Sequence, residues 1–113
     1  MILNKEEYYF RAVYMDCLKA IDFTCAQSEV DRERIVIEGG SQGGALTMAV
    51  CALDPRPYLA LADVPSNSNL EKRVEGAHGS FSSVMEYLKL YPQHTEKAFE
   101  TLSYFDTMNL ASR

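Results

Sequence analysis

One serine lies in a sequence context that could make it a nucleophile. The stretch GGSQG, residues 39–43, fits the pattern G-x-S-x-G. An apolar, β-branched run at 35–37 precedes it, and a helix-favouring stretch from residue 45 follows it. A strand, a sharp turn and a helix in this order make a nucleophile elbow, in which a strained serine projects its hydroxyl above the sheet. The pattern therefore predicts Ser41 as the nucleophile of an acyl-transfer reaction.

The residues beside Ser41 suit the same chemistry. The backbone N–H of Gln42 opens the helix, where unpaired N–H groups and the positive end of the helix dipole favour a developing oxyanion. Gln42 is therefore predicted to supply a backbone donor to an oxyanion hole, with no role for its side chain. A strand and a helix that approach this closely need small residues, and the elbow glycines are Gly39, Gly40, Gly43 and Gly44.

Two other interpretations of this turn stay open at this point. A glycine-rich turn between a strand and a helix can be purely structural. It can also bind phosphate, although the stretch lacks the Lys-Ser/Thr pair of a P-loop and its glycines do not match G-x-G-x-x-G.

A nucleophilic serine needs a base, and the base needs a carboxylate to orient it. In a hydrolase of this architecture the acid and then the histidine follow the serine along the chain. His78 and His94 do not follow strands of their own, and both are interpreted as surface histidines. Asp63 is interpreted as a cap or a polar strand end, and Asp106 lies in the tail.

The elements that must position Ser41 can be predicted from periodicity and from turn residues. Asn4 and Glu7 indicate a helix start, and apolar residues at helical spacing favour a helix over 5–26. Strands are predicted at 35–38 and 58–64, and helices at 45–53, 70–77, 82–90 and 95–102, with no closing element in the tail. A strand, a helix and a strand within about 30 residues make a βαβ unit with parallel strands and a right-handed crossover.

Two parallel strands do not make a sheet that is stable alone, because such sheets need several strands and cover on both faces. Both predicted strands have the composition of central, buried strands. The sequence therefore resembles the middle part of a larger domain. Unpaired edges and partly uncovered apolar faces are expected, and with them association of the chain.

Composition narrows the classes of partner. The 113 residues are enough for one small domain, with 47% hydrophobic and 24% charged residues and a net charge of −5. The absence of a basic stripe argues against nucleic acid and anionic membrane as partners. Neither a signal peptide pattern nor an apolar run long enough to span a bilayer is present, and a cytoplasmic location is expected. No zinc-binding spacing occurs, and the three cysteines are predicted to be unpaired, small, buried residues: Cys17, Cys25 and Cys51.

Four segments resemble the acetyl xylan esterase / cephalosporin C deacetylase family of α/β-hydrolases, which is carbohydrate esterase family seven. They are EEYYFRAVYMDCLKAIDF, VDRERIVIEGGSQGGALTMAVCALDPR, ADVP and FETLSYFDTMNLASR. GGSQGG together with LSYFD-x-x-N is far more specific than G-x-S-x-G alone. The resemblance implies an α/β fold, part of a three-layer αβα sandwich. It divides the single partial domain, 1–113, into a core at 1–65 and a helical insertion at 66–103.

The resemblance also implies an activity. It assigns Ser41 as the nucleophile and Gln42 as the backbone donor to the oxyanion. The reaction is removal of acetyl groups from short xylooligosaccharides and from cephalosporin C, with no metal or other cofactor. The partner is a small acetylated carbohydrate. The helices at 70–102 help to build a hexamer in the family, so a homo-oligomer is expected.

The chain matches a central part of the family pattern. The family's catalytic Asp and His lie beyond SYFD-x-x-N, and its second oxyanion donor precedes the YYFR helix. The isolated chain is therefore expected to lack most of the triad and to hydrolyse esters hardly at all. Two alternatives remain: an inactive fragment that acts as an assembly module through its helical insertion, or another serine hydrolase such as a peptidase. The LSYFD segment argues against the peptidase.

Overall fold

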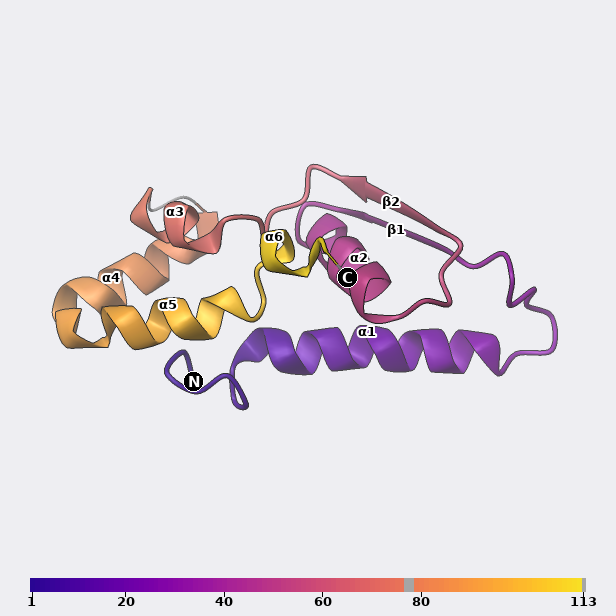
Figure 1. Cartoon of the computed structure of the whole chain (residues 1–113), viewed down its shortest axis with the longest axis horizontal. Helices are drawn as coiled ribbons and strands as arrows, with labels where there is room; N and C mark the ends of the chain where they lie inside the picture. Colours follow the sequence, from indigo (N-terminus) through magenta and orange to yellow (C-terminus); the bar gives the residue numbers. More distant parts are fainter. Residues whose placement is uncertain (77–78, 113) are drawn as a thin grey trace.

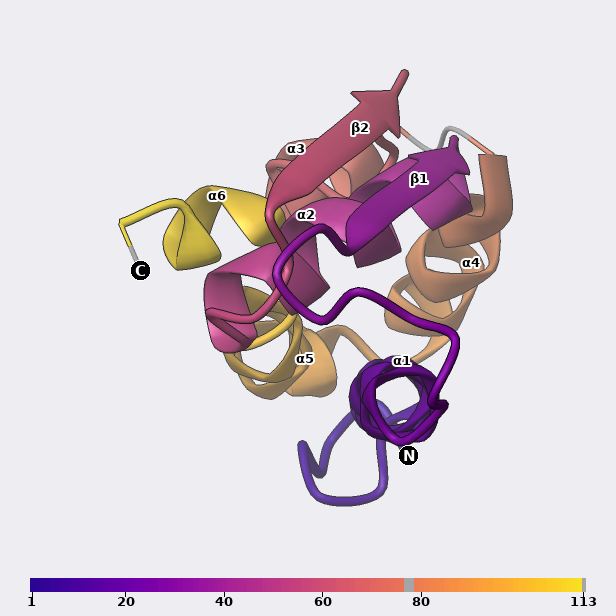
Figure 2. The ribbon, with the colours of Figure 1, turned by 90° about the vertical axis from the view of Figure 1, so that its right-hand side faces the viewer.

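Two parallel strands and the helix between them position the predicted elbow in this computed structural model, which describes residues 1–76 and 79–112. β1 (Val36–Gly40) leads into α2 (Gln42–Leu53), and β2 (Leu59–Asp63) follows. The strands pair in parallel, with Val36 opposite Leu59. Helix α2 packs against both strands and covers one face of the sheet (Figures 1 and 2). The predicted βαβ unit is therefore confirmed.

The other face of this sheet is open to solvent. Every residue of β2 is exposed, and Val36, Leu59 and Leu61 keep 50%, 45% and 47% of their surface. The two strands have the composition of strands that are buried on both faces, but the expectation of partly uncovered apolar faces in this chain is confirmed for the described residues. The physical reason is that α1 and α2 lie on the same side of the sheet (Figure 2), and no described element packs on the opposite side.

The long first helix starts later than the sequence predicts. Helix α1 (Tyr9–Cys25) is preceded by turns. Asn4 makes a local turn in which its side-chain oxygen accepts a hydrogen bond from the N–H of Glu6 at 3.0 Å, so it does not cap the helix. The buried face of α1 carries Phe10, Tyr14 and Ile21. In the part of the chain that the structure describes, no helix has the length and apolar content that a membrane span needs.

An ion-pair network fixes the end of α2 against α1. The backbone leaves the helix at Asp54, the residue before Pro55. The Arg56 guanidinium hydrogen-bonds the Asp54 carboxylate at 2.6 Å, which lowers the pKa of Asp54. The same guanidinium contacts Asp22 of α1 at 2.7 Å. One arginine therefore joins the two long helices.

Short helices form a second lobe at one end of the molecule (Figure 1). They are α3 (Leu70–Glu75), the 3₁₀ turn η1 (Gly79–Phe81), α4 (Ser82–Leu90), the 3₁₀ turn η2 (Pro92–His94) and α5 (Thr95–Ser103). The helices predicted at 82–90 and 95–102 are confirmed. Of the helix predicted at 70–77, α3 covers the first six residues and Ala77 lies outside the described residues.

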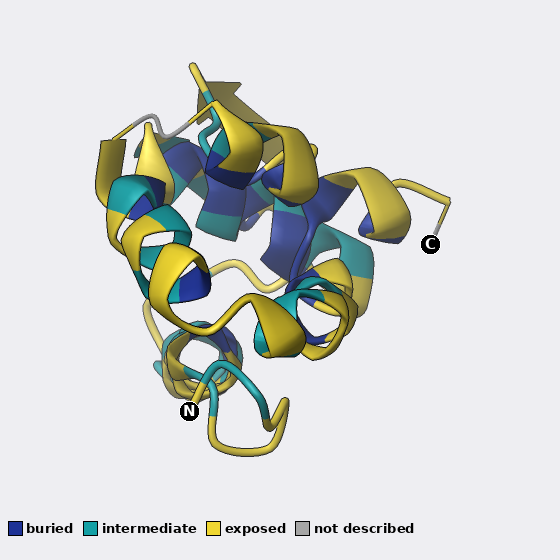
Figure 3. Ribbon diagram, turned by 90° about the vertical axis from the view of Figure 1, so that its left-hand side faces the viewer, coloured by how far each residue is buried: buried dark blue, intermediate teal, exposed yellow. Residues whose placement is uncertain are grey.

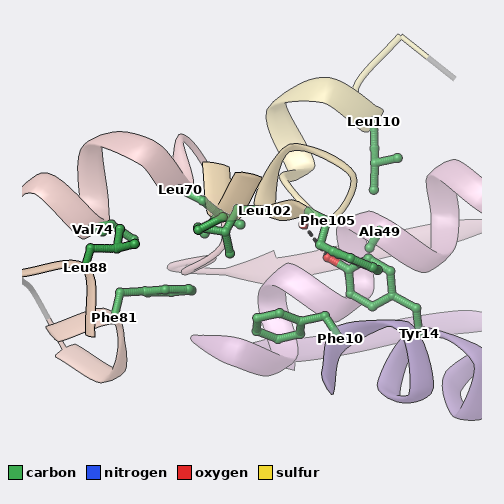
Figure 4. Close-up of a cluster of buried hydrophobic side chains, with 11 residues drawn as sticks. Phe10, Tyr14, Ala49, Leu70, Val74, Phe81, Leu88, Leu102, Phe105 and Leu110 are labelled. Carbon is green, nitrogen blue, oxygen red and sulfur yellow. Dashed lines mark hydrogen bonds between the residues drawn. The ribbon is translucent and has the colours of Figure 1, made fainter. Parts of the chain in front are cut away.

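Apolar side chains of this lobe belong to one hydrophobic core together with side chains of α1 and of the tail. The inward sides of the lobe are buried (Figure 3), and its side chains meet those of α1 and of the tail (Figure 4). Phe10 and Phe81 stack with their ring centroids 6.5 Å apart. Tyr14 packs on Phe105, and its hydroxyl donates a hydrogen bond to the Phe105 carbonyl oxygen at 2.6 Å (Figure 4).

The tail has a closing element, contrary to the prediction. Helix α6 (Thr107–Leu110) is capped by Asp106, whose carboxylate accepts a hydrogen bond from the N–H of Met108 at 2.9 Å. The same buried carboxylate accepts from the N–H groups of Asn69 at 2.9 Å and Leu70 at 2.6 Å. One aspartate therefore joins the start of α6 to the start of α3.

Two glycines allow the backbones of the βαβ unit to touch. A Cβ atom added to Gly39 would lie 2.4 Å from the carbonyl carbon and oxygen of Gly43. A Cβ atom added to Gly44 would lie 2.7 Å from the carbonyl oxygen of Asp63. Neither neighbour can move without moving the strand or the helix, so these positions admit no side chain.

Replacing Gly39 with Ala should lower the free energy of unfolding by at least ~2 kcal/mol, because the new methyl group forces two backbones apart. Gly40→Ala is the matched control on the same strand, since nothing lies within 4 Å of its added Cβ atom. Urea unfolding of both variants checks this. Equal midpoints for the two variants would contradict the close approach.

Asp106→Ala should lower the free energy of unfolding by ~3 kcal/mol or more, since it leaves the buried N–H of Leu70 and the part-buried N–H of Asn69 without an acceptor. Asp16→Ala, which removes an exposed carboxylate on α1, is the control and should cost far less. The urea midpoints compare the two. If the urea midpoint of Asp106→Ala equals that of the control, the hydrogen bonds of this carboxylate do not stabilise the fold.

The polypeptide of residues 1–113 should associate through its open sheet face. Leu61→Lys, which adds a charge to that face, should shift the population toward monomer in sedimentation velocity. Phe23→Lys adds the same charge at an exposed apolar residue of α1, outside the sheet and outside the helices at 66–103, and should leave association unchanged. A monodisperse monomer in the unmodified polypeptide would refute the expectation.

Candidate active site

Ser41 occupies a strained turn between β1 and α2. Its φ of 55° and ψ of −113° lie in a region that residues with a side chain rarely adopt, at a cost of roughly 1–3 kcal/mol. Two backbone hydrogen bonds hold it there: its N–H donates to the Asp63 carbonyl oxygen at 2.9 Å, and its own carbonyl oxygen accepts from the Ser66 N–H at 3.1 Å. The predicted geometry of the turn, a strained serine between a strand and a helix that starts at Gln42, is confirmed.

The hydroxyl of Ser41 is not used to cap the helix. A serine at this position usually accepts a hydrogen bond from a backbone N–H of the first turn. Ser41 is the N-cap of α2 and is exposed, but its side chain makes no cap hydrogen bond. Its carbonyl oxygen still accepts from the Ala45 N–H at 3.1 Å, which is the first bond of the helix. The hydroxyl therefore remains available for chemistry.

Gln42 is the first residue of α2. The first N–H groups of a helix have no acceptor within the helix, and they form its positive end. The N–H of Gln42 is therefore placed beside Ser41 as an unpaired donor, as an oxyanion site requires.

Gln42 also lines a cavity of about 540 Å³, a size typical of small-molecule sites. Its walls come from the N-terminal turns, the start of α1, the segment after β2, η1 and α4. The lining residues are Met1, Ile2, Leu3, Tyr8, Tyr9, Phe10, Gln42, Ser66, Asn67, Ser80, Phe81, Ser83, Val84 and Tyr87. None of them has a charged side chain, and burial raises the pKa of Tyr8 to about 12, so that phenol is neutral.

The structure does not bring a histidine to Ser41 within the described residues. Nδ1 of His94 lies 2.7 Å from the Tyr87 hydroxyl, and its half-buried ring packs against the rings of both Tyr87 and Tyr91. His94 is therefore a packing residue rather than a freely exposed one, and it does not line the cavity. His78 lies outside the described residues.

The two aspartates do not orient a base in the described structure. Asp63 is exposed at the end of β2, and its backbone oxygen, not its carboxylate, holds Ser41. The Asp106 carboxylate is occupied by three backbone N–H groups.

The cysteines do not provide a competing nucleophile. All three are free and half-buried, and burial raises the pKa of the Cys17 and Cys51 thiols. Among residues 1–76 and 79–112, no three His, Cys, Asp or Glu side chains are grouped as metal ligands.

Sequence reasoning missed the polar wall of the cavity. Asn67, only 1% exposed, lies in the stretch Ser66 to Asn69, which has the composition of a surface loop. Its burial depends on residues about 40 positions away: Thr107 donates hydrogen bonds from its N–H and its hydroxyl to the Asn67 carbonyl oxygen. No local signal in the sequence indicates such a contact.

Comparison with known proteins identifies a family. The family model for acetyl xylan esterase (AXE1) matches residues 1–113. The chain is 30% identical over 110 residues to acetyl esterase Axe7A of Xylanibacter ruminicola. The matched region covers 97% of this chain and 24% of that protein.

Solved structures give the same assignment. An acetyl xylan esterase from Paenibacillus sp. R4 superposes with a TM-score of 0.93 at 45% identity, over 99% of this chain and 37% of that one. Acetyl xylan esterase 1 from Thermoanaerobacterium sp. JW/SL YS485 superposes with a TM-score of 0.86 at 32% identity, over 97% and 36%. The chain thus spans about a quarter to little more than a third of these relatives.

The βαβ unit and its helices are part of an α/β-hydrolase fold, and the chain belongs to the acetyl xylan esterase (AXE1) family.

Proposed function

We propose that residues 1–113 carry the nucleophile of a carboxylic ester hydrolase that removes acetyl groups from carbohydrates. The observation that carries the proposal is the strained, exposed Ser41, whose hydroxyl is free at the N-terminus of α2. The names of the relatives support acetylated xylooligosaccharides as the substrate class. Cephalosporin C carries an acetyl ester of the same kind and is proposed as a second substrate.

The reaction takes place in two steps. Oγ of Ser41 attacks the carbonyl carbon of the acetyl ester, its proton passes to a base, and the bond to the sugar oxygen breaks. The sugar leaves as an alcohol after it takes up the proton, and Ser41 is acetylated. Water then attacks the acetyl group, which releases acetate and restores the hydroxyl.

Gln42 acts in both steps through its backbone. Negative charge develops on the carbonyl oxygen as Ser41 or water attacks. The N–H of Gln42 and the positive end of α2 stabilise this charge, and one such donor is worth on the order of 10² to 10³ in turnover. The cavity beside Gln42, which no described charged side chain lines, accommodates the rest of the substrate.

The base and its carboxylate are proposed to come from other parts of the hydrolase fold, because no described histidine contacts Ser41. The helices at 66–103 are proposed to form an insertion that contributes to a homo-oligomer, as in the family hexamer. A cytoplasmic location completes the proposal.

One observation favours a second candidate function for the 113 residues by themselves. Because His94 hydrogen-bonds to the Tyr87 hydroxyl, it does not act as a base at Ser41 in the polypeptide of residues 1–113. That polypeptide would act only in assembly, through α3, α4 and α5.

In the complete polypeptide that contains residues 1–113, Ser41→Ala should lower the turnover of p-nitrophenyl acetate by about 10⁴-fold or more, because the acetyl-enzyme cannot form. A fluorophosphonate probe should label the unmodified protein and not the variant. His94→Ala serves as the control and should change neither result.

The polypeptide of residues 1–113 alone should hydrolyse the same ester hardly faster than solvent does. A rate in this polypeptide that disappears in Ser41→Ala would rule out the assembly-only function. A complete polypeptide in which Ser41→Ala retains full turnover would refute the nucleophile.

A further inference from the structure

A series of polar groups leads from the core to the cavity that Gln42 lines. At the buried end, the Tyr14 hydroxyl donates its proton to the Phe105 carbonyl oxygen at 2.6 Å. At the cavity end, the Ser66 hydroxyl donates to Oδ1 of Asn67 at 3.0 Å, and Ser66 lines the cavity. The Asn67 side chain, only 1% exposed, contacts both hydroxyl groups and connects the two ends.

The amide of Asn67 can have only one orientation between these two hydroxyl groups. Because Tyr14 gives its single proton to Phe105, the phenol oxygen can only accept a further hydrogen bond. Burial raises the pKa of Tyr14 to about 12, and hydrogen bonding by the Asn67 side chain partly opposes that rise, as a donor to the phenol oxygen does. Nδ2 of Asn67 therefore belongs on the side of Tyr14, and Oδ1 belongs on the side of Ser66.

This orientation determines what Ser66 offers to a ligand. A serine hydroxyl has one proton to donate and two lone pairs that can accept. The proton of Ser66 is used by Oδ1 of Asn67, which has no proton of its own to give back. Ser66 is half-buried in the wall of the cavity, so its oxygen atom offers lone pairs only. A group that binds to this oxygen atom must therefore be a hydrogen-bond donor.

Ser66 is also fixed beside the predicted nucleophile. Its backbone N–H donates to the Ser41 carbonyl oxygen at 3.1 Å. The next residue, Asn67, is anchored on the other side, because its carbonyl oxygen accepts from the N–H of Thr107 at 2.9 Å and from its hydroxyl at 3.0 Å. A molecule bound at Ser66 is therefore held one backbone hydrogen bond away from the residue that attacks the ester.

The rest of the cavity indicates which kind of donor fits. The cavity, about 540 Å³, is far larger than an acetyl group, and none of its described lining residues is charged. A cationic donor would lose its hydration there without a countercharge, whereas a neutral hydroxyl group needs none. Aromatic rings of Tyr8, Phe81 and Tyr87 also line the wall. Such a wall matches a neutral sugar, which combines hydroxyl groups with apolar C–H faces.

We propose that Oγ of Ser66 accepts a hydrogen bond from a free hydroxyl group of the sugar whose acetyl ester Ser41 attacks. Ser66 is then a residue that positions the substrate. It determines specificity for a partly acetylated sugar, which keeps free hydroxyl groups, over a simple ester. This inference rests on the proposed function and adds the group that recognises the alcohol portion of the substrate.

The binding test uses Ser41→Ala in the complete polypeptide, so that the ligand is not consumed. Isothermal titration with monoacetylated xylobiose should give an affinity about five- to tenfold weaker when Ser66→Ala is added, because one hydrogen bond is lost. Ser103→Ala is the matched control, since it removes a hydroxyl group that donates to a backbone carbonyl outside the cavity, and it should leave the affinity unchanged. Equal affinities with and without Ser66→Ala, or no binding at all, overturn the inference.

A change in the ligand tests the same contact with Ser66 intact, which matters because Ser66→Ala also removes the donor to the buried Asn67 oxygen. Monoacetylated xylobiose with its free hydroxyl groups methylated should bind to Ser41→Ala at least about fivefold more weakly than the parent sugar. Adding Ser66→Ala should not weaken this methylated ligand further. Equal affinity for the two sugars, or an equal further loss for both in Ser66→Ala, refutes the hydroxyl contact.

Kinetics separate recognition from a purely structural role. Ser66→Ala in the active protein should raise KM for monoacetylated xylobiose about five- to tenfold. It should leave kcat/KM for p-nitrophenyl acetate, which has no sugar, within about twofold. An equal loss for both esters would show that Ser66 only supports the fold. If Ser41→Ala retains turnover but the titration still depends on Ser66, the proposed nucleophile fails and the sugar site stands.

Discussion

The backbone contact between β1, α2 and β2 is the constraint on which the rest of the structure depends. Gly39 meets Gly43, and Gly44 meets the carbonyl oxygen of Asp63, at distances that no Cβ atom could occupy. Because the helix starts so close to the strand, one residue must reverse the chain, and Ser41 does so at positive φ. The same proximity lets the end of β2 accept the Ser41 N–H. A relaxed turn would lose both the exposed hydroxyl and the direction of α2.

The features that depend on local sequence could be predicted. β-branched residues at 35–37, the glycines and Asp54-Pro55 determine where a strand, a turn and a helix begin or end, and the structure follows them. The predicted start of α1 was wrong because the Asn4 side chain can accept a hydrogen bond in a turn as well as at a helix N-cap. Contacts across the chain could not be predicted: the burial of Asn67 and two of the three hydrogen bonds of the Asp106 carboxylate depend on partners about 40 positions away.

Neither the element that covers each face of the sheet nor the position of the cavity could be predicted from the sequence, and the reasons differ. Apolar composition indicates that a strand can be buried, but it does not specify what covers it, and one face of this sheet is open. The cavity, by contrast, is assembled from six parts of the chain: the N-terminal turns, α1, α2, the segment after β2, η1 and α4. Its wall, which has no charged side chain among the described residues, forms only when these parts are in place, although each contributes residues of ordinary composition.

The hydrogen bonds from the tail to the segment after β2 have a consequence for the order of folding. The elbow depends on contacts within about 30 residues, so it can form early, whereas contacts of high sequence separation are slow to form. The Asn67 carbonyl oxygen has no partner until Thr107 has been synthesised, and the N–H groups at the start of α3 have none until Asp106 has been synthesised. During synthesis on the ribosome, the reactive turn should therefore precede the pocket wall, which becomes rigid only after residues 105–107 have left the exit tunnel.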